Sequence, residues 1–72
     1  MAMADVREVY VVQDRATGAF VDENMTFVTS LKWAARGESL QAVHESMNCA
    51  ILDGQLDCDD GYEVHRLLEF VD

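Results

Sequence analysis

The clearest pattern of hydrophobic and polar positions lies between Ser39 and Gly54. Apolar residues recur there at helical spacing and share one face: Leu40, Val43, Met47, Ala50 and Ile51. Polar residues take the outer face: Gln41, Glu45, Ser46 and Asn48. Ser39 is a favourable N-cap, and Gly54 stands where a left-handed C-cap residue is expected. The pattern therefore predicts a helix over residues 40–52 that packs its apolar stripe on a sheet.

The start of the chain has the pattern of a β-hairpin. Residues 6–13 are rich in β-branched and aromatic side chains, and their continuous apolar run indicates a strand buried on both faces. Asp14 and Gly18 then suit a bulged turn, because Asp bonds to its own backbone and Gly accepts a positive φ. Residues 19–21 return as a second strand. Residues 25–28 either extend that strand or form a short edge piece.

The final segment, residues 62–71, fits two patterns. Alternation places four large side chains on one side, as in a strand: Tyr62, Val64, Leu68 and Phe70. A helical stripe would instead combine Val64, Leu67, Leu68 and Val71. Gly61 and the aromatic, β-branched start favour the strand. The sequence thus predicts one α+β domain over residues 1–72, with a three-stranded antiparallel sheet (β-β-α-β, order 2-1-3) and one helix packed on one face.

The connection between hairpin and helix holds the only tryptophan, Trp33. Ser30 is suited to cap a single helical turn there, and we expect Gly37 to end it. We expect Trp33 to anchor the core at one end of the sheet; an exposed binding aromatic is the alternative.

Charge changes this picture of an ordinary small domain. The 72 residues include 14 acidic and 5 basic ones, for a net charge of −9. Residues 1–37 hold 5 acids and 4 bases (net −1), whereas residues 38–72 hold 9 acids and only Arg66 (net −8). Such a field repels nucleic-acid phosphates and anionic membranes and speeds the encounter with basic proteins. We therefore expect a protein partner, with no direct nucleic-acid or membrane binding; solubility alone is the competing explanation.

Size and motifs argue against catalysis. A chain of this length buries a thin core and leaves little room for a deep cleft. It has no nucleophile elbow and no phosphate loop, so we expect neither enzymatic activity nor a cofactor. The first residues lack the basic start and apolar stretch of a signal peptide, and no run is long enough to span a bilayer. The expected location is the cytoplasm, with Cys49 and Cys58 as free thiols; a single disulfide is the alternative.

Two groups of residues suggest metal binding only weakly. The zinc candidates are separated by four, eight and six residues, unlike a zinc knuckle: His44, Cys49, Cys58 and His65. The calcium candidates lack the EF-hand register, because counting back from Gly61 puts Leu56 and Cys58 where acids belong: Asp53, Asp57, Asp59, Asp60 and Glu63. We expect no metal site. A metal-stabilised structural module remains the third hypothesis.

The acidic residues themselves form the candidate partner-binding site. The predicted topology gathers them on the helix end, the adjoining loop and the last strand: Glu45, Asp53, Asp57, Asp59, Asp60, Glu63 and Glu69. Such a face suits docking onto a basic patch of another protein, or imitation of the phosphate backbone of DNA.

Five short segments of the chain include a strand, a Thr-Gly turn, an Ala-Ala-Arg stretch and a Ser-Leu-x-Ala helix start: residues 9–12, 14–18, 32–36, 38–42 and 61–64. In these segments the chain resembles small acidic bacteriophage proteins of the host-takeover type, which commonly carry the same features. Gly37 departs from the usual Ala-Ala-Arg-Phe form, and we expect it to loosen the start of the helix.

The resemblance implies a non-catalytic inhibitor that binds a bacterial host machine in the cytoplasm of the host cell. RNA polymerase is the first expected target, which would make the protein a transcription inhibitor. The alternative is a DNA mimic that blocks a nucleic-acid-binding or CRISPR protein. The resemblance supplies no catalytic residue, and the sequence leaves the oligomeric state open.

Overall fold

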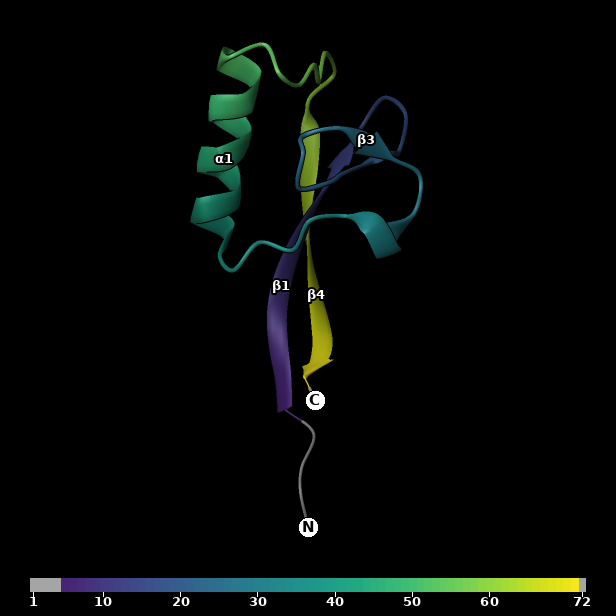
Figure 1. Ribbon diagram of the computed structural model, residues 1–72, viewed down its shortest axis with the longest axis vertical. Helices are drawn as coiled ribbons and strands as arrows, with labels where there is room; N and C mark the ends of the chain where they lie inside the picture. The colour runs from purple at the N-terminus through teal and green to yellow at the C-terminus, as the bar shows by residue number, and fades with distance from the viewer. Residues whose placement is uncertain (1–4, 72) are drawn as a thin grey trace.

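The computed structural model describes the chain from residue 5 to residue 71. The elements follow in this order: β1 (Asp5–Asp14), β2 (Phe20–Val21), β3 (Phe27–Val28), the 3-10 turn η1 (Leu31–Trp33), α1 (Leu40–Leu52) and β4 (Tyr62–Val71). Figure 1 shows β1 and β4 as a long central ribbon, with α1 on one side and the β2–β3–η1 segment on the other. The α+β class, the single helix and the antiparallel sheet are as predicted.

The sheet has four strands in the order β3-β2-β1-β4, not three. The predicted neighbours are confirmed, since β1 lies between β2 and the last strand. The additional strand is β3, which pairs with the outer edge of β2 through Phe20↔Val28 and Val21↔Phe27.

A tight turn explains why this segment pairs as a separate strand. The carboxylate of Asp22 accepts hydrogen bonds from the Asn24 N–H (2.9 Å), the Thr26 N–H (2.9 Å) and the Thr26 hydroxyl (2.8 Å). Met25 lies in the turn with φ 59°. The chain therefore reverses after β2, and residues 27–28 return beside it.

The β1–β4 ladder is continuous from Asp5↔Val71 to Asp14↔Tyr62. The last segment is therefore a strand over its whole length, as its Gly61 and β-branched start favoured. On its other edge β1 pairs with β2 through Gln13↔Phe20 and forms a single bridge from Tyr10 to Gly37.

The core lies between α1 and the ribbon. Six buried residues form it: Val12, Val21, Val43, Met47, Ala50 and Leu56. Val9 and Val11 are also buried (3% and 1% exposed). Because side chains alternate along a strand, these two point away from Val12 and α1. The expectation that β1 is buried on both faces is confirmed.

The helix keeps its predicted bounds and its predicted N-cap, and its C-cap is Asp53, one residue before Gly54. The Ser39 side chain accepts a hydrogen bond from the Ala42 N–H (3.1 Å), and Gly54 adopts φ 74° beyond the helix end. The middle of the apolar stripe is buried, but Leu40 and Ile51 at its ends are exposed (47% and 39%). The narrow sheet covers only the middle of the stripe.

Three expectations about the connection to the helix are wrong. The helical turn capped by Ser30 ends at Trp33, with Ala34 as its C-cap, and not at Gly37. Trp33 is 64% exposed, with the Lys32 ammonium 5.2 Å from its ring, and the small Ala34 is the buried residue beside it. Gly37 does not loosen the helix start, because it exchanges two backbone hydrogen bonds with Tyr10 (2.8 and 3.0 Å). A Cβ at Gly37 would overlap the Val43 side chain, so glycine lets the chain pass closely beneath α1.

Candidate protein-binding surface

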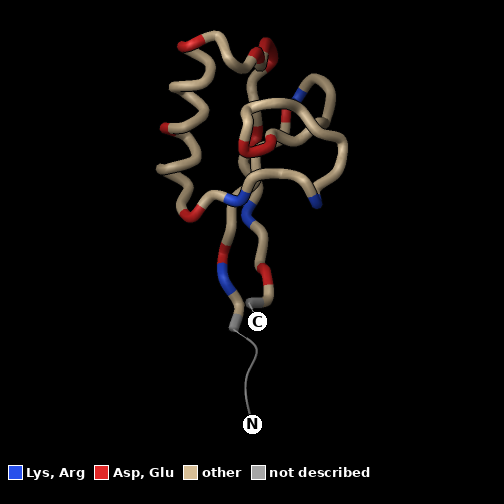
Figure 2. The backbone as a smooth tube through the Cα atoms, in the orientation of Figure 1, with Lys and Arg blue, Asp and Glu red and all other residues tan. Residues whose placement is uncertain are grey.

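The strongest concentration of acidic residues lies where α1 ends and the chain crosses to β4. We call Asp53, Asp57, Asp59 and Asp60 the acidic end of the molecule. Asp53 is the C-cap of α1, and all four side chains are exposed. Figure 2 shows the red backbone of acidic residues at the top of the molecule, at the helix end and in the following loop.

The backbone of this loop is held at both ends. Leu56 is buried in the core, and the N–H groups of Gln55 and Leu56 donate to the Ala50 carbonyl (2.9 and 3.3 Å). The Gly61 N–H donates to the Cys58 carbonyl (2.9 Å). The core and these bonds therefore fix the positions from which the acidic side chains project.

The charges at the acidic end oppose one another. The pKa of Asp59 is raised, first because its carboxyl shares a hydrogen bond with Asp57 and then because the Asp57 charge repels its ionised form. The last turn of α1 contains no basic residue, although the negative end of the helix dipole lies there beside Asp53. A Lys or Arg at this position would stabilise the helix. The arrangement is thus unfavourable for folding and favourable for attracting a cation or a basic surface.

The Cys58 thiol lies close to these carboxylates. Burial raises the pKa of Cys58, and the charges of Asp14, Asp57 and Asp59 raise it further. Cys58 therefore stays protonated at neutral pH, and a neutral thiol is a poor nucleophile. Cys49 and Cys58 are both free, as expected.

Three of the seven predicted residues lie away from the acidic end. Glu45 is exposed in the middle of α1, where it accepts a hydrogen bond from the Gln41 amide (3.2 Å). Glu63 follows the loop on β4 and forms salt bridges with Arg15 (3.7 Å) and His65 (3.4 Å, when that ring is protonated).

Glu69 is the third, and the structure separates it from the others. It lies seven residues beyond Tyr62 on β4, about 23 Å along the strand. It forms salt bridges with Arg7 (3.6 Å) and Arg36 (3.2 Å). The seven predicted residues therefore do not share one region: the four residues of the acidic end are together, and Glu69 is at the opposite end of the ribbon among arginines.

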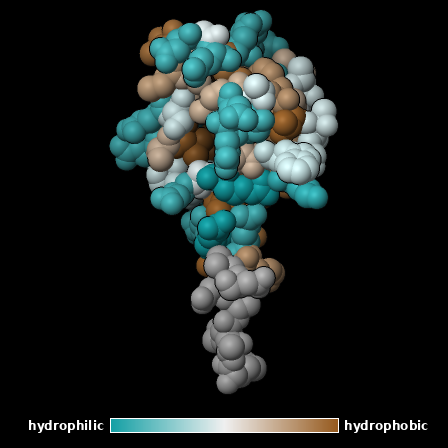
Figure 3. Space-filling model, viewed as in Figure 1, coloured by the Kyte–Doolittle hydropathy of each residue, from teal (hydrophilic) through white to brown (hydrophobic). Residues whose placement is uncertain are grey.

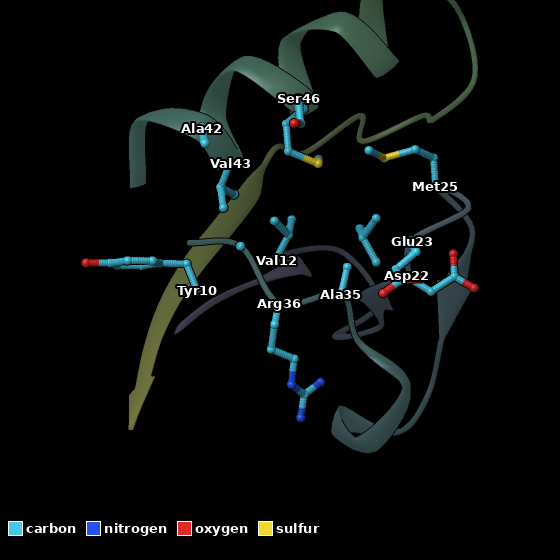
Figure 4. A pocket seen from close by; sticks show the side chains of 13 residues that line it. Tyr10, Val12, Asp22, Glu23, Met25, Ala35, Arg36, Ala42, Val43 and Ser46 are labelled. Carbon is cyan, nitrogen blue, oxygen red and sulfur yellow. The ribbon is translucent and has the colours of Figure 1, made fainter. Parts of the chain in front are cut away.

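A hollow of about 250 Å³ lies between α1, the Asp22–Met25 turn and the segment before the helix. In Figure 4 the side chains of Val12, Val43 and Met25 point toward it, and Arg36 points away. Figure 3 shows hydrophobic residues in the depth of a hollow on this face. On its rim, hydrogen bonds from Thr26 lower the pKa of Asp22 and keep it ionised. The hollow is therefore lined by apolar side chains, and the Asp22 carboxylate on its rim holds the turn together.

The structure also bears on metals and membranes. Across residues 5–71, no three His, Cys, Asp or Glu side chains come together as metal ligands. In the same part of the chain, no helix has the length and apolar character needed to cross a bilayer.

Comparison with protein-family models, with curated proteins and with solved structures gives no match to this chain. The likeness to small phage proteins therefore rests on the short segments named above.

Sequence reasoning missed an exposed apolar group on the β3–η1 segment. Phe27, Leu31 and Trp33 are exposed (41%, 39% and 64%). Tryptophan is one of the side chains enriched among the residues that contribute most to binding at protein interfaces. A single helical turn has no periodicity from which exposure can be read, so the sequence carried no signal that separated a buried Trp33 from an exposed one.

Proposed function

We propose that this chain is a non-catalytic inhibitor that docks its acidic end onto a basic surface of a bacterial host protein, with RNA polymerase as the first candidate. The observation that carries the proposal is the uncompensated charge of the acidic end. Within the described residues, none of Asp53, Asp57, Asp59 and Asp60 forms a salt bridge. Local arrangements that oppose folding are expected at functional sites.

Solubility alone accounts for this placement less well. Acidic residues spread over the surface would keep the protein soluble without raising the pKa of Asp59 or adding charge at the negative end of α1. Concentrated charge on a fixed loop instead steers association with a basic patch and defines the orientation of the complex.

The test is binding of the purified protein to RNA polymerase core enzyme in a native gel and by calorimetry, together with a transcription assay. The triple variant D57N/D59N/D60N should lose at least about tenfold in affinity, since each charged contact contributes more than a neutral one. The matched control E8Q/E23Q/E38Q changes the net charge from −9 to −6 as well, but removes exposed acids outside the acidic end. It should bind almost as tightly as the wild type.

Two results would count against the proposal. If both triple variants bind with equal affinity, the acidic end acts only through its share of the net charge. If the wild type binds no polymerase subunit, RNA polymerase is excluded as the target. The DNA-mimic alternative makes a different prediction: the captured protein is a nucleic-acid-binding or CRISPR protein, and DNA competes for its groove.

A further inference from the structure

The outer edge of β4 has no partner in the described structure. The sheet order places β4 at one end, and its only ladder is the one with β1. Between residues 5 and 71, no other backbone segment or side chain hydrogen-bonds to the backbone of Tyr62–Val71. Ten residues of strand edge are therefore open to another strand.

The direction of the free groups follows from Tyr10. Its N–H and C=O are both bonded to Gly37, so they point away from β4. Tyr10 lies opposite Arg66, and the N–H and C=O groups of two residues in such a pair both point outward. Alternation then puts the backbone groups of every second residue on the free edge: Tyr62, Val64, Arg66, Leu68 and Phe70.

The strand carries charged side chains at Glu63, Arg66 and Glu69, but it lacks two other usual protections of a free edge. It contains no proline, and its register with β1 runs without a bulge. Leu68 and Phe70 are 66% and 78% exposed, beside the 51% exposed Val6 on the neighbouring strand. The free backbone groups of β4 and the exposed apolar side chains together resemble a protein–protein interface.

We propose that β4 pairs antiparallel with β4 of a second copy of this chain, across a two-fold axis that passes through Leu67. The two four-stranded sheets then form one continuous sheet. This inference is independent of the proposed function, since it uses a different surface.

The register follows from side-chain pairing. In an antiparallel pair across a two-fold axis perpendicular to the sheet, opposed residues lie on the same face, so the axis must pass through a residue. Only axes at Arg66 or Leu67 overlap nearly the whole of β4. An axis at Arg66 opposes two arginines, and also opposes Glu63 to Glu69 of the partner, which is unfavourable.

The axis at Leu67 avoids both like-charge pairs, and it places Arg66 opposite Leu68 of the partner. Leu67 opposes its own copy, and Val64 opposes Phe70 of the partner. His65 opposes Glu69 of the partner, so the one acidic residue in this half of β4 meets a ring that can donate to it. The even-numbered residues oppose one another in this register, and their N–H and C=O groups are those on the free edge.

The net charge does not prevent this pairing. The axis through Leu67 places the two acidic ends at opposite ends of the joined strands, and the two Tyr62 residues lie about 34 Å apart. The Debye length is about 8 Å at physiological ionic strength, so the acidic ends hardly repel each other. Antiparallel pairing of two copies is therefore more favourable than parallel pairing, which would bring like charges side by side.

The first test is the mass of the protein in solution, by sedimentation equilibrium over a concentration series at physiological salt. We expect a monomer–dimer equilibrium between 8.1 kDa and twice that mass. Leu68→Pro removes an N–H that is free in the monomer and donated in the dimer, so the dissociation constant should rise at least about tenfold. Leu68→Ala is the matched control, because it removes the side chain and keeps the N–H; it should dimerise more strongly than Leu68→Pro.

A wild type that stays monomeric into the submillimolar range overturns the proposal and leaves the edge to a different chain. Equal weakening by Leu68→Pro and Leu68→Ala also overturns it, because association would then depend on the side chain and not on the strand edge. Circular dichroism verifies that both variants are folded.

The second test does not depend on the proline variant. In a background with Cys49 and Cys58 replaced by Ser, Leu67→Cys places two thiols opposite each other at a non-hydrogen-bonded pair, with Cα atoms about 4.5 Å apart, within disulfide range. Mild oxidation should cross-link it. Leu68→Cys is the control: it is more exposed than residue 67 but lies opposite Arg66 of the partner, so it should cross-link slowly. Faster cross-linking of Leu68→Cys overturns the register.

Discussion

The two ends of the β1–β4 ribbon are built from the same pair of strands and differ in what covers them. At the covered end, Tyr10–Asp14 pair with Tyr62–Arg66 beneath α1, and the core lies there. At the open end, Val6–Glu8 pair with Leu68–Phe70, and the apolar side chains on the helix side of the ribbon are exposed. One strand pair thus serves as scaffold at one end and as free surface at the other.

Charge differs between the ends in the same way. The acidic end adjoins the covered end and has no salt bridge within the described residues. At the open end, Glu69 is bonded to Arg7 and Arg36, and Glu8 lies 3.7 Å from Arg66. The net charge of the chain does not show this contrast. At the open end the acidic side chains pair with arginines, whereas the four carboxylates of the acidic end have no basic partner within the described residues.

The largest expected effect comes from a substitution in the core, compared with one at the open end of the ribbon. Met47 is 2% exposed, and Met47→Ala should lower the free energy of unfolding by about 3 kcal/mol. For a domain of this size, that is a fall in Tm of about 12–24 °C. Leu68→Ala removes an apolar side chain from the open end of the same ribbon and should cost less than about 0.5 kcal/mol, measured on dilute protein. Similar losses for both variants would show that the open end is also packed.

The next effect is the change in stability when one acidic side chain is neutralised, and its sign should differ between the two ends. Glu69→Gln removes two salt bridges, one with the partly buried Arg36 and one with the exposed Arg7, and should cost about 0.5–1 kcal/mol. Asp60→Asn removes the same formal charge at the acidic end, where the neighbours are acidic, and should leave stability unchanged or slightly higher. Urea unfolding of both variants at low and physiological salt measures this. A loss of stability in Asp60→Asn equal to that in Glu69→Gln would mean that an attractive partner for Asp60 exists in the folded protein.

The parts of the fold that the sequence predicted are those with strong local signals. Ser39 and Gly54 mark the helix ends through capping chemistry that is the same in any context. Asp14 and Gly18 mark the first turn likewise: Gly18 has φ 77°, and the Asp14 carboxylate accepts from the Thr17 hydroxyl (2.8 Å). The apolar run of β1 predicted a central strand because a strand covered on both faces has no polar side.

The errors concern residues whose environment is set by distant parts of the chain. Trp33 is exposed and its neighbour Ala34 is buried, and composition does not predict which of the two faces the core. Gly37 is required by the approach of Val43 from the following helix. Glu69 shares its strand with Glu63, but only the register with β1 shows that it lies opposite Arg7.

The smallest effect compares two carboxylates with opposite pKa shifts. The pKa of Asp59 is raised by the hydrogen bond and charge of Asp57, so the folded state holds this proton more tightly than the unfolded state. Its contribution to stability is present in full below the ordinary Asp pKa and is lost as pH rises through the raised value. The pKa of Asp22 is lowered by hydrogen bonds from Thr26, so its contribution is present above the ordinary value and is lost as pH falls through the lowered one.

Asp59→Asn should therefore melt slightly above the wild type at pH 7, and Asp22→Asn below it. The Asp59→Asn difference should shrink first as the pH falls, because its raised pKa lets wild-type Asp59 take up a proton early. The Asp22→Asn difference should persist to lower pH, because the pKa of Asp22 is lowered. Thermal melts at matched ionic strength from neutral to acid pH follow the two differences separately. If the Asp59→Asn difference were negative at pH 7, ionised Asp59 would be stabilised in the fold, and the acidic end would no longer be a region where charge opposes folding. The two ends of the ribbon would then differ only in whether α1 and the core cover them.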